Sequence, residues 1–166
     1  MSDPILSGHQ PHYYQPVLFK GFGTVELSKN VTLGYNPSPF VFSGYCHIEA
    51  RQKSAKISIG EGTYINNNAT LIGDQSEIRI GKKCLIGPNF TIFDSDFHGT
   101  HPQARDQYKV LPVIIGDNVF IGANVTITKG VTIGDGCTIA AGAVVNQSFE
   151  SNCIIGGNPA ALIKHV

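Results

Sequence analysis

The most regular feature of the chain is an aliphatic residue at every sixth position between residues 115 and 145. These positions are Ile115, Ile121, Ile127, Ile133, Ile139 and Val145. A helix repeats about every 3.6 residues and a strand about every 2, so a period of six indicates a repeat architecture. Each unit is therefore predicted to be a very short strand followed by a turn, and the small residues behind many of these positions, such as Gly116, allow that turn.

Three such units would close one triangular coil of about 18 residues, and successive coils would stack as rungs of parallel sheets about 4.8 Å apart. Ile115 is then predicted to lie beneath Ile133, Ile121 beneath Ile139, and Ile127 beneath Val145. The same period runs, less regularly, through residues 59–71 and 80–92, and Val25 and Val31 are candidates for its start. A change of phase predicts a bulge or loop between residues 73 and 77.

The repeat stops between residues 92 and 115, and this interruption is the second informative feature. Because long connections without secondary structure are usually functional, the insertion at 94–112 is expected to build a site. The whole chain, 1–166, is predicted to be a single domain. Residues 1–23 are expected to form an irregular arm, the aromatic-rich segment 35–45 an ordered loop, and 146–166 a cap on the last coil.

Composition narrows the classes of function. The net charge is zero with 14% charged residues, and there is no basic stripe, so a nucleic-acid partner is not expected. No apolar run approaches the roughly 18 residues of a membrane span, and the first residues lack the pattern of a secretory leader. Four cysteines occur singly, without a CxxC pair, which is typical of reduced thiols in a cytoplasmic protein.

The run IGDNVFIGANVTITKGVTIGDGCTIAAGAVV, followed by GGNPAALI, resembles the hexapeptide-repeat acyltransferases. Within them it is most similar to the sugar O-acetyltransferases typified by maltose and galactoside acetyltransferase. The resemblance implies an all-β fold, the left-handed parallel β-helix of hexapeptide repeats with an inserted active-site loop. It also implies a homotrimer and acetyl-CoA bound in a groove between neighbouring coils.

The insertion also contains residues that resemble the family's catalytic motif. HGTHPQAR is similar to the family's catalytic pattern H-P-x-D-P-x-x-R and places His98 at its histidine, with Gly99 and His101 departing from the pattern. An acceptor hydroxyl or amine must lose a proton as it attacks a thioester, and an imidazole is well suited to be that general base. His98 and His101 have a spacing that allows metal chelation, but no convincing third ligand follows, so no metal is expected.

The resemblance implies further roles. Asn66 falls at an asparagine that supports the tetrahedral intermediate, although the match could slip to Asn67 or Asn68. The residues expected to contact the acceptor are Asp74, Asp94, Asp96 and Arg105. The residues expected to contact the cofactor are Phe120, Gly122, Ala123, Ala140, Ala141, Asn158 and Lys164.

The leading hypothesis is thus a cytoplasmic, trimeric, acetyl-CoA-dependent acetyltransferase. It is expected to modify an oxygen or nitrogen of a carbohydrate or sugar nucleotide, in cell-surface polysaccharide or sugar-nucleotide synthesis. The insertion at 94–112 and the loop at 35–45 are expected to shape the acceptor pocket. Three alternatives stay open: an antibiotic acetyltransferase of the same fold, a zinc carbonic anhydrase of the γ type, and a scaffold protein without activity.

Overall fold

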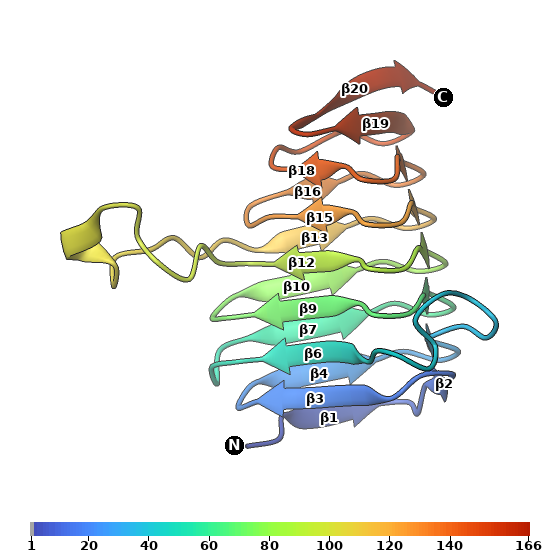
Figure 1. Cartoon of the computed structure of the whole chain (residues 1–166), viewed down its shortest axis with the longest axis horizontal. Helices are drawn as coiled ribbons and strands as arrows, with labels where there is room; N and C mark the ends of the chain where they lie inside the picture. The colour runs from blue at the N-terminus through green and yellow to red at the C-terminus, as the bar shows by residue number, and fades with distance from the viewer. Residues whose placement is uncertain (1) are drawn as a thin grey trace.

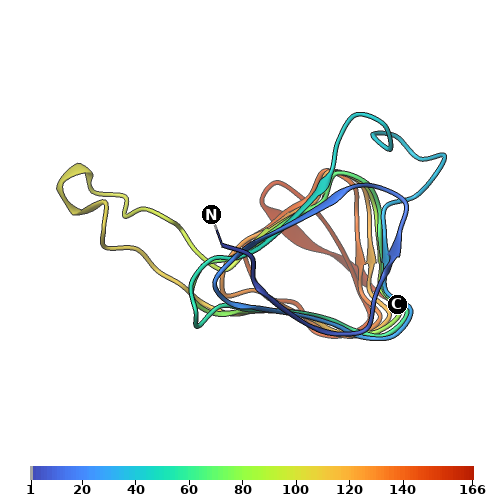
Figure 2. The ribbon, with the colours of Figure 1, turned by 90° about the horizontal axis from the view of Figure 1, so that it is seen from below.

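The computed structural model describes residues 2–166 and is a triangular prism of stacked coils (Figures 1 and 2). Each complete coil contributes one short strand to each of three sheets, named A, B and C in the order in which the chain meets them. The corners of the prism are named below by the two sheets that they join. Neighbouring strands are parallel throughout, except at the end of sheet B.

The strands fall into the sheets in a regular rotation. Sheet A contains β1 (Ile5–Gly8), β4 (Thr24–Leu27), β7 (Lys56–Ile59), β10 (Glu77–Ile80), β13 (Val113–Ile115) and β16 (Thr132–Ile133). Sheet B contains β2 (His12–Tyr13), β5 (Thr32–Leu33), β8 (Tyr64–Ile65), β11 (Leu85–Ile86), β14 (Phe120–Ile121), β17 (Thr138–Ile139), β19 (Cys153–Gly157) and β20 (Ala160–His165). Sheet C contains β3 (Val17–Gly21), β6 (Cys46–Ala50), β9 (Thr70–Gly73), β12 (Thr91–Phe93), β15 (Thr126–Ile127) and β18 (Val144–Val145).

The six-residue positions form the core of the prism, as predicted. The three predicted stacking pairs, Ile115 with Ile133, Ile121 with Ile139 and Ile127 with Val145, are all register pairs of neighbouring strands, and their side chains are buried. The start of the repeat differs from the prediction. Leu27 and Leu33 pair with the six-residue positions of the next coil, whereas Val25 and Val31 belong to the second buried stripe, two residues earlier.

The corners explain why asparagine and glycine recur between the strands. At the A–B corner one residue of each coil from the second onward has a left-handed backbone, with φ between 54° and 69°. These residues are Asn30, Gly62, Lys83, Asn118, Gly136 and Asn152. Glycine and asparagine adopt this conformation at the lowest cost, so the corner can turn within a few residues.

The first coil corrects the expectation of an irregular arm at 1–23. Strands β1, β2 and β3 form a complete rung beneath the second coil (Figure 1). Its inward positions pair Gly8 with Leu27, Tyr13 with Leu33 and Phe19 with Ile48. A glycine and two aromatic residues therefore stand where the other coils have aliphatic ones, and the spacing shortens once to five residues, which hides the repeat.

The other end of the prism is a hairpin. After β18 the chain crosses sheet A with a bridge between Phe149 and Ile133 and then adds β19 to sheet B. The turn at Asn158 and Pro159 reverses the chain, so that β20 pairs antiparallel with β19. Within residues 2–166 the one helix is the short 3-10 helix η1 (Pro102–Ala104), and no helix there is long and apolar enough to cross a membrane.

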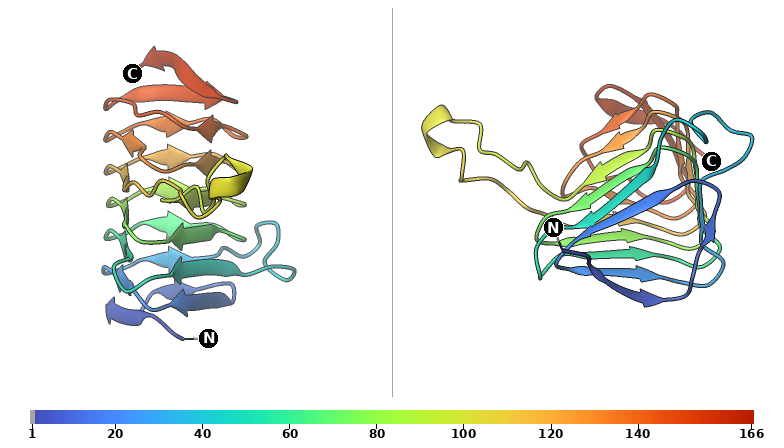
Figure 3. Two further views of the ribbon diagram at one scale, coloured as in Figure 1. Left: turned by 90° about the vertical axis from the view of Figure 1, so that its left-hand side faces the viewer. Right: turned by 60° about the horizontal axis from the view of Figure 1, so that its bottom comes forward.

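Two excursions leave the prism at different corners. The loop at 35–45 connects β5 to β6 at the B–C corner, and the insertion at 94–112 connects β12 to β13 at the C–A corner. Viewed along the prism they point away from each other (Figure 2), and the insertion projects well beyond the coils (Figure 3). The predicted break between residues 73 and 77 is the short turn between β9 and β10.

Candidate functional site

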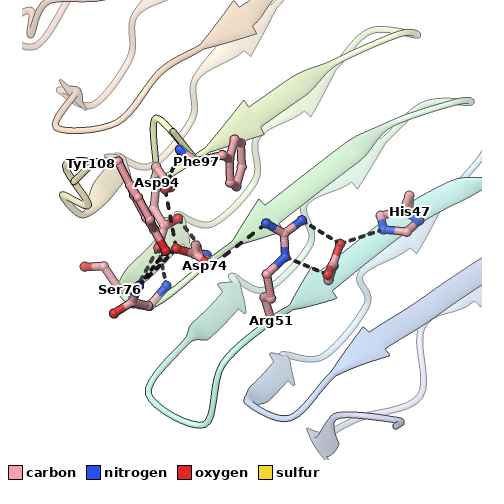
Figure 4. Close-up of polar contacts among 10 residues, drawn as sticks. His47, Arg51, Asp74, Ser76, Asp94, Phe97 and Tyr108 are labelled. Atoms are coloured by element: carbon pink, nitrogen blue, oxygen red, sulfur yellow. Dashed lines mark hydrogen bonds and ion pairs between the residues drawn. The ribbon is translucent and has the colours of Figure 1, made fainter. Parts of the chain in front are cut away.

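The insertion begins at a fully buried carboxylate, Asp94. Its Oδ1 accepts a hydrogen bond from the backbone N–H of Asp74 at 2.7 Å, and its Oδ2 accepts from those of Ser76 at 2.8 Å and Gln75 at 3.3 Å (Figure 4). Burial raises the pKa of the Asp94 carboxyl, while these backbone donors oppose the shift. Asp94 therefore ties the insertion to the turn between β9 and β10, and both of its carboxylate oxygens, expected to contact an acceptor, accept from backbone donors here.

Backbone pairing continues from Asp94 into the insertion. Leu111 donates to the Asp94 carbonyl at 2.8 Å, Asp96 donates to the Lys109 carbonyl at 3.0 Å, and an isolated antiparallel bridge joins Ser95 to Val110. The Asp96 side chain also forms an ion pair of 2.6 Å with Lys129. The two ends of the insertion thus leave the prism as a paired stem.

His98 lies where this stem opens, and its side chain is exposed. Arg105 closes the loop beyond it by donating to the carbonyl oxygens of Gly99 at 2.7 Å and Thr100 at 3.3 Å. Gly99 donates its own N–H to the Arg105 carbonyl at 3.0 Å, and a Cβ at Gly99 would lie 2.2 Å from the Ala104 carbonyl oxygen. Proline at this position would lose the donor and lack the space, which explains the departure from the family pattern. In this structure the guanidinium of Arg105, which was expected to contact the acceptor, holds the loop closed through these two hydrogen bonds.

His101 is also exposed, and its Nδ1 accepts from the N–H of Gln103 at the start of η1, at 3.3 Å. No group of three or more His, Cys, Asp or Glu side chains within residues 2–166 is arranged to hold a metal ion. Asp74 is buried, and its Oδ2 accepts from Gln75 Nε2 at 3.2 Å and from Ser95 Oγ at 3.4 Å. Asp74, also expected to contact the acceptor, therefore supports the base of the stem through its contact with Ser95.

The outer face of sheet C carries a chain of charged side chains that leads to the stem (Figure 4). Glu49 accepts from Arg51 Nε at 2.9 Å and Nη2 at 3.4 Å, and it lies 3.2 Å from His47 Nε2. The hydrogen bond from Arg51 is the main reason that the pKa of Glu49 is lowered. The guanidinium also lies 3.9 Å from Asp74 and 4.9 Å above the centre of the Phe97 ring.

Asn66 lies at the other corner, B–C, directly after β8. Its Oδ1 accepts from the N–H of Asn67 at 2.7 Å. Asn67 is buried and holds the loop at 35–45: it accepts from the Tyr35 N–H at 2.8 Å and donates to carbonyl oxygens of Tyr35, Ser38 and Pro39. Of the two neighbours considered for the Asn66 role, Asn67 is thus committed to the loop, and exposed Asn68 donates to Asn89 at 2.7 Å.

The small residues predicted to meet the cofactor form one continuous strip along this same B–C corner. Backbone hydrogen bonds connect its rungs in order, from Asn66 to Ile86, from Gly87 to Ile121, from Gly122 to Ile139 and from Ala140 to Ile155. Gly122 packs so closely on the next rung that a Cβ would lie 2.6 Å from the Ala141 nitrogen.

The remaining predicted cofactor residues lie at or near this strip. Ala123 and Ala141 lie at the same corner, and Ala141 and Phe120 are exposed. Asn158 is exposed in the hairpin turn at the end of the strip, and Lys164 is exposed on β20. Gly122, Ala123 and Ala140 are half-buried and Ala141 is exposed, so these small side chains would let a pantetheine arm approach the main chain closely.

The structure thus divides the predicted site residues between two corners of the prism. Asn66, the small-residue strip and the loop at 35–45 share the B–C corner, whereas His98 and Asp96 lie at the C–A corner. Within one chain, sheet C stands between the two groups (Figure 2). The two loops expected to shape one acceptor pocket consequently do not meet in the same chain.

Comparison with known proteins finds relatives among hexapeptide-repeat proteins and acetyltransferases. Residues 112–147 match the family model described as the hexapeptide repeat of succinyl-transferase. Sophorolipid acetyltransferase from Starmerella bombicola is 48% identical over 112 residues, which cover 66% of this chain and 42% of that protein. A second relative, from Dictyostelium discoideum, is 39% identical, and this chain covers 58% of it. The chain therefore spans about half the length of the curated relatives that it matches.

Solved structures agree with this class. A hexapeptide-repeat acetyltransferase from Vibrio cholerae, solved with acetyl coenzyme A, has a TM-score of 0.61 and 37% identity over 66% of this chain and 60% of that one. Galactoside acetyltransferase in complex with coenzyme A has a TM-score of 0.62 and 37% identity, covering 66% of this chain and 55% of that one. The similarity to hexapeptide-repeat acyltransferases is thus confirmed, and the chain has their left-handed parallel β-helix.

Sequence reasoning missed the contribution of Glu49, Arg51 and Phe97. Phe97 is part of the DSDFHG run around His98, but nothing local marks it as a residue that needs support. Arg51 and Glu49 lie more than 40 residues earlier in the chain and reach Phe97 only through the stacking of coils. The register of sheet C is the information that would have been needed.

Proposed function

We propose that the protein is an acetyl-CoA-dependent acetyltransferase that acts on a hydroxyl or amine of a carbohydrate or sugar nucleotide. The observation that carries the proposal is the exposed imidazole of His98 on a braced stem, in a prism that also has a small-residue strip ending at Asn66. The names of its structural neighbours, galactoside acetyltransferase and maltose O-acetyltransferase, favour a sugar as acceptor.

In this proposal His98 is the general base. It removes the proton from the acceptor as the acceptor oxygen or nitrogen attacks the thioester carbonyl, a contribution of about 10²–10⁴ in rate. Acetyl-CoA supplies the activated acetyl group when bound. The Oδ1 of Asn66 is occupied by the Asn67 N–H, so the Asn66 amide is oriented to donate from its NH₂ group toward developing negative charge.

The strip at the B–C corner is proposed to hold the cofactor. Main-chain groups beside Gly122, Ala123, Ala140 and Ala141 would bind the pantetheine amides, with Phe120 packing beside them. Asn158, in the turn at the end of the strip, and Lys164, on β20 opposite Ile154, would meet the phosphates. Lysine provides a compact charge rather than the two-pronged contact of arginine.

The separation of the two groups of residues supports a site shared between copies. A homotrimer of prisms would bring the His98 stem of one chain to the B–C corner of the next, completing a site that one chain leaves divided. Asp96 and the exposed aromatic rings of Phe40 and Phe42 would then face the acceptor from opposite sides. The four buried cysteines are free thiols, which favours a reducing compartment such as the cytoplasm for this trimer. A role in cell-surface polysaccharide or sugar-nucleotide synthesis follows from the proposed carbohydrate acceptor.

The test is thiol release from acetyl-CoA with a panel of sugars, sugar nucleotides and oligosaccharides. His98→Ala should lower turnover at least 100-fold while CoA binding is kept. His101→Ala, in the same exposed loop, is the matched control and should stay close to wild type. Equal rates in wild type and His98→Ala would refute the mechanism, and a protein that binds no CoA would be a scaffold.

A mixing experiment tests the shared site. His98→Ala and Asn66→Ala chains are each expected to be nearly inactive alone. After unfolding and refolding together, mixed trimers should regain activity because some sites then combine an intact His98 with an intact Asn66. No recovery in mixed trimers of confirmed composition would contradict a site built from two copies.

A further inference from the structure

The backbone immediately before His98 is held in an uncommon conformation. Phe97 has φ of 59°, in the left-handed region that a large side chain rarely adopts. Two hydrogen bonds close this turn: Phe97 donates its N–H to Ser95 Oγ at 2.9 Å, and His98 donates its N–H to the Asp96 carbonyl at 2.7 Å. Such a conformation persists only where the surroundings over-determine it.

The surroundings of the Phe97 ring meet this requirement. The ring packs edge-on against Phe93, the last residue of β12, with 5.8 Å between the ring centres. The guanidinium of Arg51 lies over the ring at 4.9 Å, a distance at which a cation is attracted to an aromatic face. Phe97 is thus held between a core strand and a cation on the outer face of sheet C (Figure 4).

Arg51 itself has little freedom. Both carboxylate oxygens of Glu49 accept from its guanidinium, at 2.9 and 3.4 Å, and Glu49 is in turn contacted by His47. A planar guanidinium held by a two-oxygen contact keeps its orientation, which an ammonium group would not. The row of charged side chains on the outer face of sheet C therefore ends at the Phe97 ring, one residue before the proposed base His98.

From this geometry we infer that Arg51 is a positioning residue for His98. It holds the Phe97 ring, so that the left-handed turn aims the His98 side chain from the mouth of the stem, and Glu49 holds Arg51. The inference rests on the proposed function for its catalytic consequence. Arg51 touches neither the reacting atoms nor His98 in this assignment, because it acts through Phe97.

The kinetic test compares Arg51→Met, Arg51→Lys and Phe97→Leu with Arg79→Met, a control on the exposed face of β10 in sheet A. Arg51→Met should lower kcat about 10- to 100-fold, since a small displacement of a catalytic group is costly. The KM for acetyl-CoA should stay within about twofold. Arg51→Lys should recover part of kcat because it keeps a cation over the ring.

A double-variant cycle identifies the route of the effect. If Arg51 acts through Phe97, the Arg51→Met and Phe97→Leu double variant should be no slower than the worse single variant, whereas independent roles would multiply. Multiplied losses, or a kcat of Arg51→Met equal to that of Arg79→Met, would overturn the inference.

Amide hydrogen exchange provides a measurement that does not depend on activity. The amides of Phe97 and His98 should exchange at least tenfold faster in Arg51→Met than in wild type, with Arg79→Met unchanged. If wild type transfers no acetyl group to any acceptor, the proposed function fails, yet exchange still decides whether Arg51 holds the turn. Unchanged exchange at both amides in Arg51→Met would refute the inference in either case.

Discussion

Replacing Asp94 by asparagine tests whether this residue supports the stem or serves the acceptor. The substitution keeps the shape of the side chain but replaces one acceptor oxygen by an NH₂ group. Oδ1 accepts one backbone N–H at 2.7 Å, and Oδ2 accepts two, at 2.8 and 3.3 Å. An asparagine can satisfy only one of these sides, so at least one well-formed backbone donor loses its partner in a site without solvent.

The magnitude follows from the balance of burial and hydrogen bonding. Burial raises the pKa of the Asp94 carboxyl although its three backbone donors oppose the shift, and the substitution leaves at least one of those donors without a partner. The appropriate figure is therefore the cost of one unsatisfied buried donor, about 1–3 kcal/mol. For a chain of this size about 2 kcal/mol corresponds to a fall of roughly 4–8 °C in Tm.

The assay is thermal and urea unfolding followed by circular dichroism, with Asp96→Asn as the matched control. Asp96 is 43% exposed and paired with Lys129, and an exposed ion pair contributes about 0–1 kcal/mol. Asp94→Asn should lower the free energy of unfolding clearly more than Asp96→Asn. The KM for the acceptor should change little. An Asp94→Asn protein as stable as wild type, with a strongly raised acceptor KM, would refute the structural assignment.

Wild type and Asp94→Asn should also differ in how their free energy of unfolding depends on pH. Because the folded-state pKa of Asp94 is raised above its ordinary value of 3.8, the folded protein holds this proton more tightly than the unfolded chain. The contribution of the group is full below the unfolded pKa and is lost as pH rises through the folded pKa. The stability advantage of wild type over Asp94→Asn should therefore be larger near pH 4 than at pH 7; an advantage that shrinks on acidification would contradict the raised pKa.

Three further predictions concern the prism itself. Within the described residues the buried hydroxyl of Tyr64 has no hydrogen-bond partner, and burial raises its pKa to about 12. Tyr64→Phe should therefore leave the free energy of unfolding unchanged or raise it by about 1 kcal/mol, and a clear loss of stability would contradict this. Ile121→Ala, at a fully buried position, should cost about 2–5 kcal/mol in urea unfolding, whereas Leu85→Ala, 54% exposed, should cost far less. Asn67→Ala removes hydrogen bonds worth about 2 kcal/mol that hold the loop at 35–45. Chymotrypsin should therefore cut after exposed Phe42 at least tenfold faster in this variant than in wild type. An unchanged cleavage rate would show that other contacts hold the loop.

The coils were predictable because their signal is local and repeated. Every turn from Ile59 to Val145 restates the same inward aliphatic position, so the period survives single exceptions. The first coil escaped because Gly8 and Tyr13 take inward positions at the end of the prism, where packing from below is absent within the described residues. A six-residue period in the sequence therefore reveals a coil only where its inward residues are aliphatic, as they are in the other coils.

The candidate site was predictable only in part, for a related reason. His98 and the boundaries of its insertion follow from the interruption of the period together with a short motif. The burial of Asp94 and the support of Phe97 by Arg51 arise instead from contacts across stacked coils. Asp94 looks like a ligand for an acceptor in the linear sequence, and only the register of β9 with β12 turns it toward backbone donors.

The direction of β20 determines whether the stack can lengthen. A column of parallel rungs presents at its end the same unpaired N–H and C=O groups that join its own coils, so the first coil of another copy could in principle continue it, as in a fibril. In sheet B the last strand instead runs antiparallel to β19, so the outermost edge has a different hydrogen-bond pattern from every rung below it. One reversed strand thus gives a repeating architecture a defined length and makes end-to-end polymerisation unfavourable along that sheet.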